Sequence, residues 1–592
     1  MCGIVGYFGR EIAGKEAIEM LKNLEYRGYD SWGISIKQKN GFFTLKKVGK
    51  ISQAKIPKLP KAKIAILHSR WATHGNVTAI NAHPHFSNNG KIVVVHNGII
   101  ENYQELKEKL KKEGFRFKTQ TDTEVIPNIL QKNLGTKKAT KQDLLLAMAK
   151  TVRELEGNYA LLIMHKDVDA IFAARKGSPL LAGIDKSGNA FFASDISAFL
   201  KHTNDTIFFN DGELAVADCS GISFSDFALK PIKKHAKKIA LNISQLDKQG
   251  YPHYMIKEIM EQRETVKEAI TQNDEKIMDL AKAINESFGS YLIGCGTAGR
   301  VALAGTYLFS KIARKHVNFT VASEFPNYID FIKNKSLVIA ISQSGETADT
   351  LEAIWAAKKK NAKIMAIINS PGTTMERLSD YVLPVRVGIE KSVASTKAAT
   401  GQIAILALLA YASVGKLKEG KHRLFHISDA INEMLTDKLL DKTKELAKRI
   451  KKNHSIYIIG RGLNYPIALE SAIKLQEIGY IHAEGFAAGE LKHGPLALIE
   501  KNTPCIAFVS EDENKKDILS NAMEVKARGG FIIGIAPKNN EIFNYWIKVP
   551  DEKDLTMLIN LIPIQLLAYY LGVEKGHDVD YPRNLAKCCT VK

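Results

Sequence analysis

Cysteine is scarce in this sequence, which has six in 592 residues, widely scattered apart from the adjacent Cys588 and Cys589. Such sparse thiols do not build a disulfide framework, which favours a reducing, cytoplasmic compartment, and their spacing matches no metal site. The first residues also lack a basic region followed by an apolar run, so we expect no signal peptide.

Long apolar runs are missing as well. Residues 403–415 are too short to cross a bilayer, which takes about 20 apolar residues, and residues 557–573 carry Asn560, Pro563 and Gln565. We interpret both stretches as buried helices and expect no membrane partner.

The sequence also lacks a set of basic residues concentrated on one predicted face. The formal charge is +20, but the lysines are spread along predicted helices and are not interleaved with aromatic residues. Proteins that bind nucleic acid concentrate positive charge on one face. We therefore interpret the lysines as solvated, expect no nucleic-acid partner, and keep an acidic small substrate as a secondary explanation.

What is present begins with short apolar stretches over residues 1 to about 240, bounded by Gly, Asn and Asp. This pattern is typical of strands. Helical stretches near 15–24 and 102–113 interrupt the strands, so we expect a layered α+β domain.

Polar residues gather where these predicted strands end, after 64–70 and after 91–96 and again in residues 120–124. Each cluster has a plain explanation as an ion pair, a turn or a helix cap. Together they have complementary chemistry. Arg70 and Asp122 suit the carboxylate and the amine of an amino acid. Asn97 and Gly98 suit a developing oxyanion.

Cys2 gives these clusters a nucleophile. Once Met1 is removed, its thiol lies beside its own α-amine, whose reference pKa of about 7.7–8.0 lets it act as a base near neutral pH. While Met1 remains, that nitrogen is an amide and the activity should be absent. Taken alone, Cys2 is more simply a small residue that opens a strand.

From about residue 288 apolar strands alternate with long helical stretches, which predicts parallel sheets. The pattern occurs twice, near 285–420 and 453–572. In both copies the first strand ends in a glycine-rich turn, but the spacing for a dinucleotide is incomplete.

The two copies differ where a later strand ends. The first continues Ser342-Gln343-Ser344-Gly345-Glu346-Thr347, which places three hydroxyls at a helix N-terminus and suits a phosphate. The second continues Ser510-Glu511-Asp512-Glu513, whose carboxylates repel one. The sequence therefore predicts one phosphate site per chain.

Three charged residues, Glu470, Lys474 and Glu477, share one face of a predicted helix, because they are four and three positions apart. A solvated ion pair is the plain explanation. However, the helix starts at the carboxyl edge of a parallel strand, which is the usual side for a site.

Four N-terminal motifs, MCGIVGY, SRWATHG, HNGIIEN and TDTE, resemble the glutaminase domain of the N-terminal-nucleophile glutamine amidotransferases. The repeated modules with SQSGET, ELKHGP and the terminal DVDYPRNLAK resemble the sugar isomerase (SIS) domains of the glucosamine-6-phosphate synthase family. The resemblance implies an α+β layered αββα hydrolase domain followed by two α/β parallel-sheet SIS domains. It implies these segments: glutaminase 1–240, linker and helix 241–284, SIS 285–420, helical connector 421–452, SIS 453–572 and catalytic tail 573–592.

For the glutaminase, the resemblance implies that Cys2 releases ammonia from glutamine at an oxyanion hole formed by Asn97 and Gly98. It implies glutamine contacts from Arg70, Thr73, His74 and Asp122. Trp71 would gate an ammonia channel.

For the isomerase, the resemblance implies a Schiff base between Lys587 and fructose 6-phosphate, so neither a metal nor an organic cofactor is expected. Glu477 would move a proton between C1 and C2, Lys474 would support the sugar oxygens, and His493 of a neighbouring subunit would assist ring opening, which implies a homodimer. The implied sugar-phosphate contacts are Thr297, Ser342, Gln343, Ser344, Thr347, Val393 and Ser395.

The chain departs from the family pattern at three places. Ala298 stands where a serine is common, Arg263 where a proline is usual, and Cys588-Cys589 near the end forms a pair open to oxidation. Two alternatives stay open, an amidotransferase or deglycase for another sugar phosphate and a sugar-phosphate sensor without catalysis.

Overall fold

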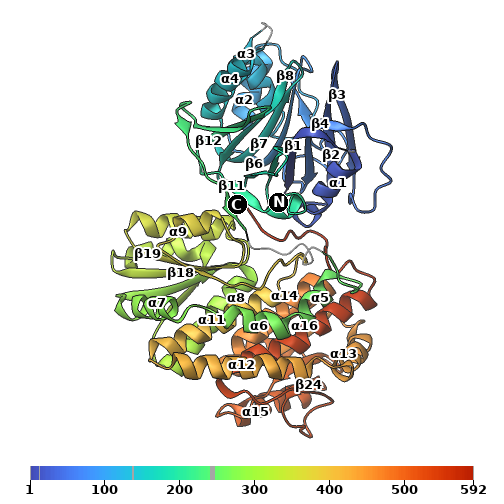
Figure 1. The fold of residues 1–592 in the computed structure, drawn as a ribbon. Coiled ribbons are helices and arrows are strands. Elements are labelled where there is room, and N and C mark those ends of the chain that lie inside the picture. The colour runs from blue at the N-terminus through green and yellow to red at the C-terminus, as the bar shows by residue number, and fades with distance from the viewer. Residues whose placement is uncertain (1, 13, 136–138, 240–246, 591–592) are drawn as a thin grey trace. The chain divides into compact units, whose positions relative to one another are not determined.

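The computed structural model describes residues 2–12, 14–135, 139–239 and 247–590. The chain forms two compact units, Met1–Asp247 with Ala586–Lys592, and Lys248–Leu585 (Figure 1). Met1 and the expected boundary between residues 240 and 241 lie outside the described residues.

Two antiparallel sheets form the first unit. One sheet contains, in pairing order, β15 (Lys237–Lys238), β11 (Asp205–Phe208), β9 (Leu181–Ile184), β10 (Ala190–Ala193), β1 (Gly3–Ile12), β4 (Ala62–Arg70), β2 (Ser31–Gln38) and β3 (Gly41–Val48). The other contains β14 (Pro231–Ile232), β13 (Gly221–Asp226), β12 (Glu213–Asp218), β8 (Val168–Lys176), β7 (Gly157–His165), β6 (Ile92–Ile100) and β5 (His85–Phe86).

Side chains that point alternately to the two faces of each strand form the layers of this unit. On β6, Val93 and Val95 point into a core shared with β1 and β4, whereas Ile92 and Val94 point into a core lined by helices. Those helices are α2 (Tyr103–Lys112), α3 (Val125–Leu134) and α4 (Lys141–Glu154), and α1 (Gly14–Lys22) packs against β1 and β4. The layered αββα fold expected from the sequence is confirmed.

The second unit holds two parallel sheets of five strands each. The first has the order β17 (Asn318–Val321), β16 (Gly289–Gly294), β18 (Ser336–Ser342), β19 (Lys363–Ile368) and β20 (Tyr381–Pro384). The second has the same order, with β22 (His482–Ala487), β21 (Ser455–Gly460), β23 (Pro504–Phe508), β24 (Phe531–Ala536) and β25 (Tyr545–Lys548). The predicted duplication is confirmed strand by strand.

Helices surround and join these sheets. They are α5 (Tyr254–Met260), α6 (Gln262–Ile270), α7 (Asp274–Glu286), α8 (Gly296–Leu308), α9 (Ala348–Lys359), α10 (Thr374–Leu378), α11 (Lys397–Ser413), α12 (Leu417–Met434), α13 (Asp437–Ile450), α14 (Tyr465–Gly479), α15 (Lys515–Lys526) and α16 (Thr556–Glu574). The apolar stretches interpreted as buried helices are α11 and α16, and both are buried along nearly their whole length.

A single hydrophobic core unites the two sheets of the second unit. On β18, Leu337, Ile339 and Ile341 enter this shared core, which also contains residues of α11, α14 and α16. Val338 and Ala340 face the other way, into a smaller core with α9. Among the described residues, only Lys553–Glu574 is long and apolar enough to span a membrane, and 89% of its most apolar window is buried inside the protein.

Candidate active sites

Cys2 lies immediately before β1 and is half-buried. The peptide N–H of Trp71 donates to its sulfur at 3.2 Å, and the side-chain amide of Asn97 donates to its carbonyl oxygen at 2.8 Å. Burial raises the pKa of the thiol, although the Trp71 N–H and the Arg70 charge oppose this shift. A thiol in this state needs a base before it can attack a substrate.

Gly98 follows Asn97 on β6 with a φ of +119°, a backbone conformation that favours glycine. A Cβ atom here would lie 1.9 Å from the carbonyl oxygen of Asn158 on the neighbouring strand β7. The structure thus brings Cys2 and Asn97 into contact, with Gly98 next along the strand, and only glycine fits that position.

The loop after β4 is held from inside by Arg70, which is buried. Its guanidinium donates to the carbonyl oxygens of His74 at 2.5 Å, Gly75 at 3.0 Å and Asn76 at 3.2 Å. The structure therefore shows Arg70 ordering the loop, a role that the sequence pattern did not predict.

The same loop presents the other expected residues. Thr73 is exposed, and its hydroxyl lies 3.3 Å from Nδ1 of His74. Trp71 packs edge-on against the ring of Tyr29 at 5.5 Å, and Asp30 accepts the next peptide N–H, that of Ala72, at 2.8 Å. The Tyr29-Asp30 pair therefore fixes the segment that contains Trp71.

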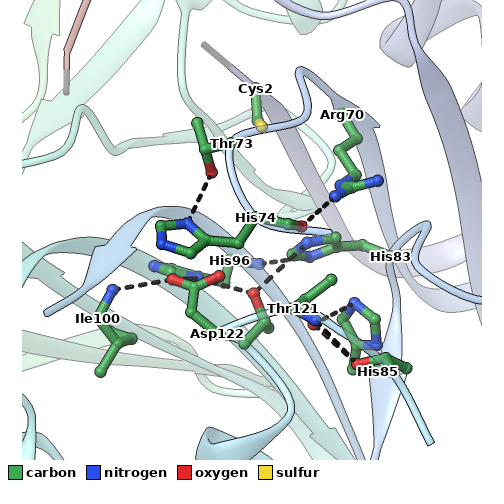
Figure 2. A network of polar contacts seen from close by, with 12 residues as sticks. Cys2, Arg70, Thr73, His74, His83, His85, His96, Ile100, Thr121 and Asp122 are labelled. Atoms are coloured by element: carbon green, nitrogen blue, oxygen red, sulfur yellow. Dashed lines mark hydrogen bonds and ion pairs between the residues drawn. The ribbon is translucent and has the colours of Figure 1, made fainter. Parts of the chain in front are cut away.

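Asp122, the remaining residue expected to bind glutamine, contacts strand β6. Its carboxylate is buried, accepts the N–H of Ile100 at 2.9 Å and lies 3.9 Å from Nδ1 of His96 (Figure 2). One strand, β6, thus positions both Asn97 and Asp122.

Four buried histidines behind this loop were missed by sequence reasoning: His68, His83, His85 and His96. His68 and His83 stack at 3.9 Å between ring centroids, and His83 meets His85 at 4.6 Å. Burial lowers the pKa of each ring, that of His68 to about 3. The available signal was their density, since five of the 16 histidines, these four and His74, fall between residues 68 and 96.

In the second unit, the expected phosphate loop joins β18 to α9. The hydroxyl of Ser342 accepts the N–H of Gly345 at 2.9 Å and lies 3.5 Å from the hydroxyl of Thr347, the residue before α9. The hydroxyl of Ser344 also lies 3.5 Å from that of Thr347. Gly345 has a φ of +66°, and a Cβ there would collide with Thr373. The three hydroxyls thus converge at one helix N-terminus.

The three charged residues of α14 form a buried triad. The ammonium of Lys474 is fully buried, 2.6 Å from Glu477 and 3.4 Å from Glu470. Thr297, at the start of α8, donates to Glu470 at 3.0 Å. Burial raises the pKa of Glu470 to about 7. Burial opposes the charge of Lys474, but the two carboxylates outweigh it and raise the pKa of Lys474. The solvated explanation for this face is wrong.

The remaining isomerase residues lie on two loops and the tail. Val393 donates its N–H to the carbonyl of Asp580 at 3.0 Å, and Ser395 donates to Glu390 at 3.2 Å. The carboxylate of Asp580 in turn accepts the N–H groups of Tyr254 and Met255 at the start of α5.

Two implied catalytic residues are not joined to the triad by any contact described above. His493 ends a short 3-10 helix (Ala488–His493) and is exposed. Lys587 belongs to the residues 586–592 that group with the first unit. The second unit therefore assembles the phosphate loop and the triad, but not Lys587.

Comparison with known proteins covers the whole chain. The chain matches the glutamine amidotransferase domain over residues 68–201 and the SIS domain over residues 288–412 and 449–575. It is 42% identical to the glutamine-fructose-6-phosphate aminotransferase (isomerizing) of Methanosarcina acetivorans and 41% identical to that of Pyrococcus horikoshii, over 100% of each chain. The C-terminal domain of glucosamine-fructose-6-phosphate aminotransferase from Francisella tularensis superposes with a TM-score of 0.53 at 36% identity, covering 56% of this chain and 99% of that one.

Proposed function

This chain belongs to the glutamine-fructose-6-phosphate aminotransferase (isomerizing) family, and we propose from its two sites how its residues divide the reaction. The chain forms glucosamine 6-phosphate from fructose 6-phosphate and glutamine, a step of amino-sugar biosynthesis. The observation that supports the division is that each unit has its own buried polar site, one built around a thiol and one around a lysine with two carboxylates.

In the first unit, Cys2 attacks the side-chain amide of glutamine. The α-amine exposed by loss of Met1 takes the thiol proton and passes it to the leaving ammonia, and water then hydrolyses the thioester to glutamate. Asn97 and the N–H of Gly98 stabilise the oxyanion. Residues of two loops hold the glutamine: Arg70, Thr73, His74 and Asp122. Trp71, packed on Tyr29, gates the passage of ammonia.

In the second step, Lys587 forms an imine with C2 of fructose 6-phosphate, and the carbonyl oxygen leaves as water. Ammonia replaces the lysine at C2, Glu477 moves a proton from C1 to C2, and the C1 hydroxyl proton passes to the nitrogen, which leaves the aldehyde at C1 and the amine at C2. Lys474 supports the sugar oxygens, and His493 assists ring opening. The residues proposed to bind the sugar phosphate are Thr297, Ser342, Gln343, Ser344, Thr347, Val393 and Ser395.

Two further properties follow from the same proposal. His493 acts on the site of a second copy, so the active form is a homodimer, and the exposure of His493 supports this role. The scattered free cysteines support a cytoplasmic location. The synthase is favoured over a deglycase or a sensor because both the nucleophile set and the buried triad are intact.

A product assay with fructose 6-phosphate and either glutamine or ammonium tests the division. Cys2→Ala should lose use of glutamine and keep activity with ammonium. Lys587→Ala should keep glutamine hydrolysis and make no amino sugar, because no imine forms. Amino-sugar formation by Lys587→Ala at the wild-type rate would show that Lys587 does not form the imine.

A further inference from the structure

The end of β6 that leads into Asn97 has histidine side chains where a neighbouring strand would be. Strand β5 pairs with β6 only at Val93 and Val94. Beyond that point, the N–H of His96 donates to Nδ1 of His83 at 3.3 Å, and Nε2 of His68 lies 2.8 Å from the carbonyl oxygen of His96. Two stacked imidazoles thus satisfy both backbone groups of His96, which would otherwise be buried and unpaired at the strand edge.

These contacts determine where the protons lie on the rings. His83 accepts a hydrogen bond at Nδ1, and because burial keeps the ring neutral, its proton is on Nε2. That Nε2–H points to the hydroxyl oxygen of Thr123, 3.5 Å away. The Thr123 hydroxyl then has its own proton to donate, and Nδ1 of His96 lies 2.9 Å from it.

The hydrogen bonds therefore close into a circuit. It runs from the N–H of His96 to His83, from His83 to Thr123, and from Thr123 back to the ring of His96. With the His83 proton on Nε2, the Thr123 hydroxyl can accept from His83 and donate to Nδ1 of His96.

The circuit joins the two halves of the glutamine site. His96 directly precedes Asn97 and Gly98, and Thr123 directly follows Asp122. The carboxylate of Asp122 is also held to the same strand by the N–H of Ile100 at 2.9 Å. The spacing between the oxyanion donors and the carboxylate thus depends on Thr123 and His83.

We propose that Thr123 and His83 are positioning residues of the glutaminase, which set the distance between the oxyanion hole and the carboxylate that receives the substrate amine. The proposal rests on the glutaminase function proposed above. A displacement of about 1 Å in such a site can cost roughly a hundredfold in rate.

The first test replaces the hydroxyl and keeps the shape. Thr123→Val should lower kcat/KM for glutamine hydrolysis at least tenfold, with a lower kcat and a higher KM, because both halves of the site shift. Thr123→Ser should restore it to within about threefold. Rates are counted per reactive Cys2, titrated with a glutamine analogue that carries an electrophile in place of the amide, so that loss of folded protein does not count. A kcat/KM for Thr123→Val within twofold of wild type would overturn the proposal.

The chain offers a matched control in Thr121. Its hydroxyl lies 3.3 Å from Nε2 of His85 and 3.0 Å from the hydroxyl of Thr119, in the same buried cluster but outside the circuit. Thr121→Val should leave glutamine kinetics unchanged. An equal loss in both valine variants would mean that any buried hydroxyl matters here, and the positioning role would be rejected.

A double-mutant cycle tests whether Thr123 and His83 act together. His83→Asn keeps an acceptor for the His96 N–H and removes the link to Thr123. If the circuit is one unit, the double variant loses no more than the worse single variant. Multiplicative losses would refute the circuit. Ammonium-dependent synthesis should be normal in every variant, and a wild-type protein without glutamine hydrolysis would instead refute the proposed function.

Discussion

The two SIS modules have the same strand order but use the serine at the end of the third strand differently. In the first module, Ser342 accepts a backbone N–H of its own loop, and its hydroxyl neighbours gather beside it. In the second, Ser510 accepts from Asn464 at 2.8 Å and lies 3.2 Å from the hydroxyl of Thr556. Asn560 extends this buried network to Asn464.

This difference fits the proposal that only the first module binds the sugar phosphate. In the second module, contacts with Asn464 and Thr556 occupy the hydroxyl of Ser510. The next residue, Glu511, pairs with Lys515. The strand order is shared, so any difference in anion binding between the two modules would come from the residues that follow these strands.

The helices that follow the first strand of each module also differ, and here the second module carries the proposed catalytic side chains. Helix α8 of the first module contains no acidic residue, whereas α14 of the second carries the buried triad. Thr297 of α8 donates to Glu470 of α14 and so connects the two. In the proposed mechanism, the phosphate loop and the acid-base residues thus belong to different copies.

The largest expected effect comes from removing the cation of the triad. Lys474→Met should reduce amino-sugar formation about a thousandfold from either nitrogen source, because Glu477 loses the partner that holds its carboxylate in place. Glutamine hydrolysis should persist. Breaking a buried pair also costs about 3–5 kcal/mol, which thermal unfolding would record.

Lys515→Met is the matched control, since Lys515 forms a partly exposed pair with Glu511 in the same module. Partly exposed pairs contribute about 0–1 kcal/mol, so activity and stability should hardly change. Retention of more than a tenth of wild-type synthesis by Lys474→Met would contradict a catalytic triad.

The next, smaller effect is a pH dependence of stability that comes from Glu470 of α14 and has no counterpart in α8, which contains no acidic residue. Burial raises the pKa of Glu470 to about 7, above its unfolded value, so the folded state keeps a proton that the unfolded chain loses. Its stabilising contribution is full below about pH 4.5 and is lost as pH rises to 7, at about 1.4 kcal/mol per pH unit. Urea unfolding of wild type and Glu470→Gln should therefore diverge between pH 5 and 7 and run parallel above. A constant difference across that range would mean that Glu470 titrates normally.

The smallest expected effect concerns the threonine hydroxyls beside Ser342 and Ser510, which belong to Thr347 and Thr556. Thr347→Val should raise KM for fructose 6-phosphate about tenfold, because it removes a hydroxyl from the phosphate loop. Thr556→Val, which removes the hydroxyl beside Ser510 in the second module, should leave KM unchanged and cost about 1 kcal/mol of stability for one hydrogen bond. Equal changes in KM would show that both modules contribute to phosphate binding.

Local pattern predicted the duplicated modules, the hydroxyls at the end of β18 and the shared face of Glu470, Lys474 and Glu477. It did not predict that this face is largely buried, because the spacing of residues along a helix is the same for a solvent-exposed face and a buried one. The cover includes Thr297, 173 positions away. The circuit around His96 was equally hidden, since its members come from three separate segments.

The contact between Asp580 and α5 sets a constraint on how the chain is made. Asp580 provides the acceptors for Tyr254, at the first turn of the second unit, from 326 positions further along. A ribosome therefore finishes α5 long before the carboxylate that completes it has been synthesised. The start of α5 lacks these acceptors until then, and contacts of such long range are slow to form.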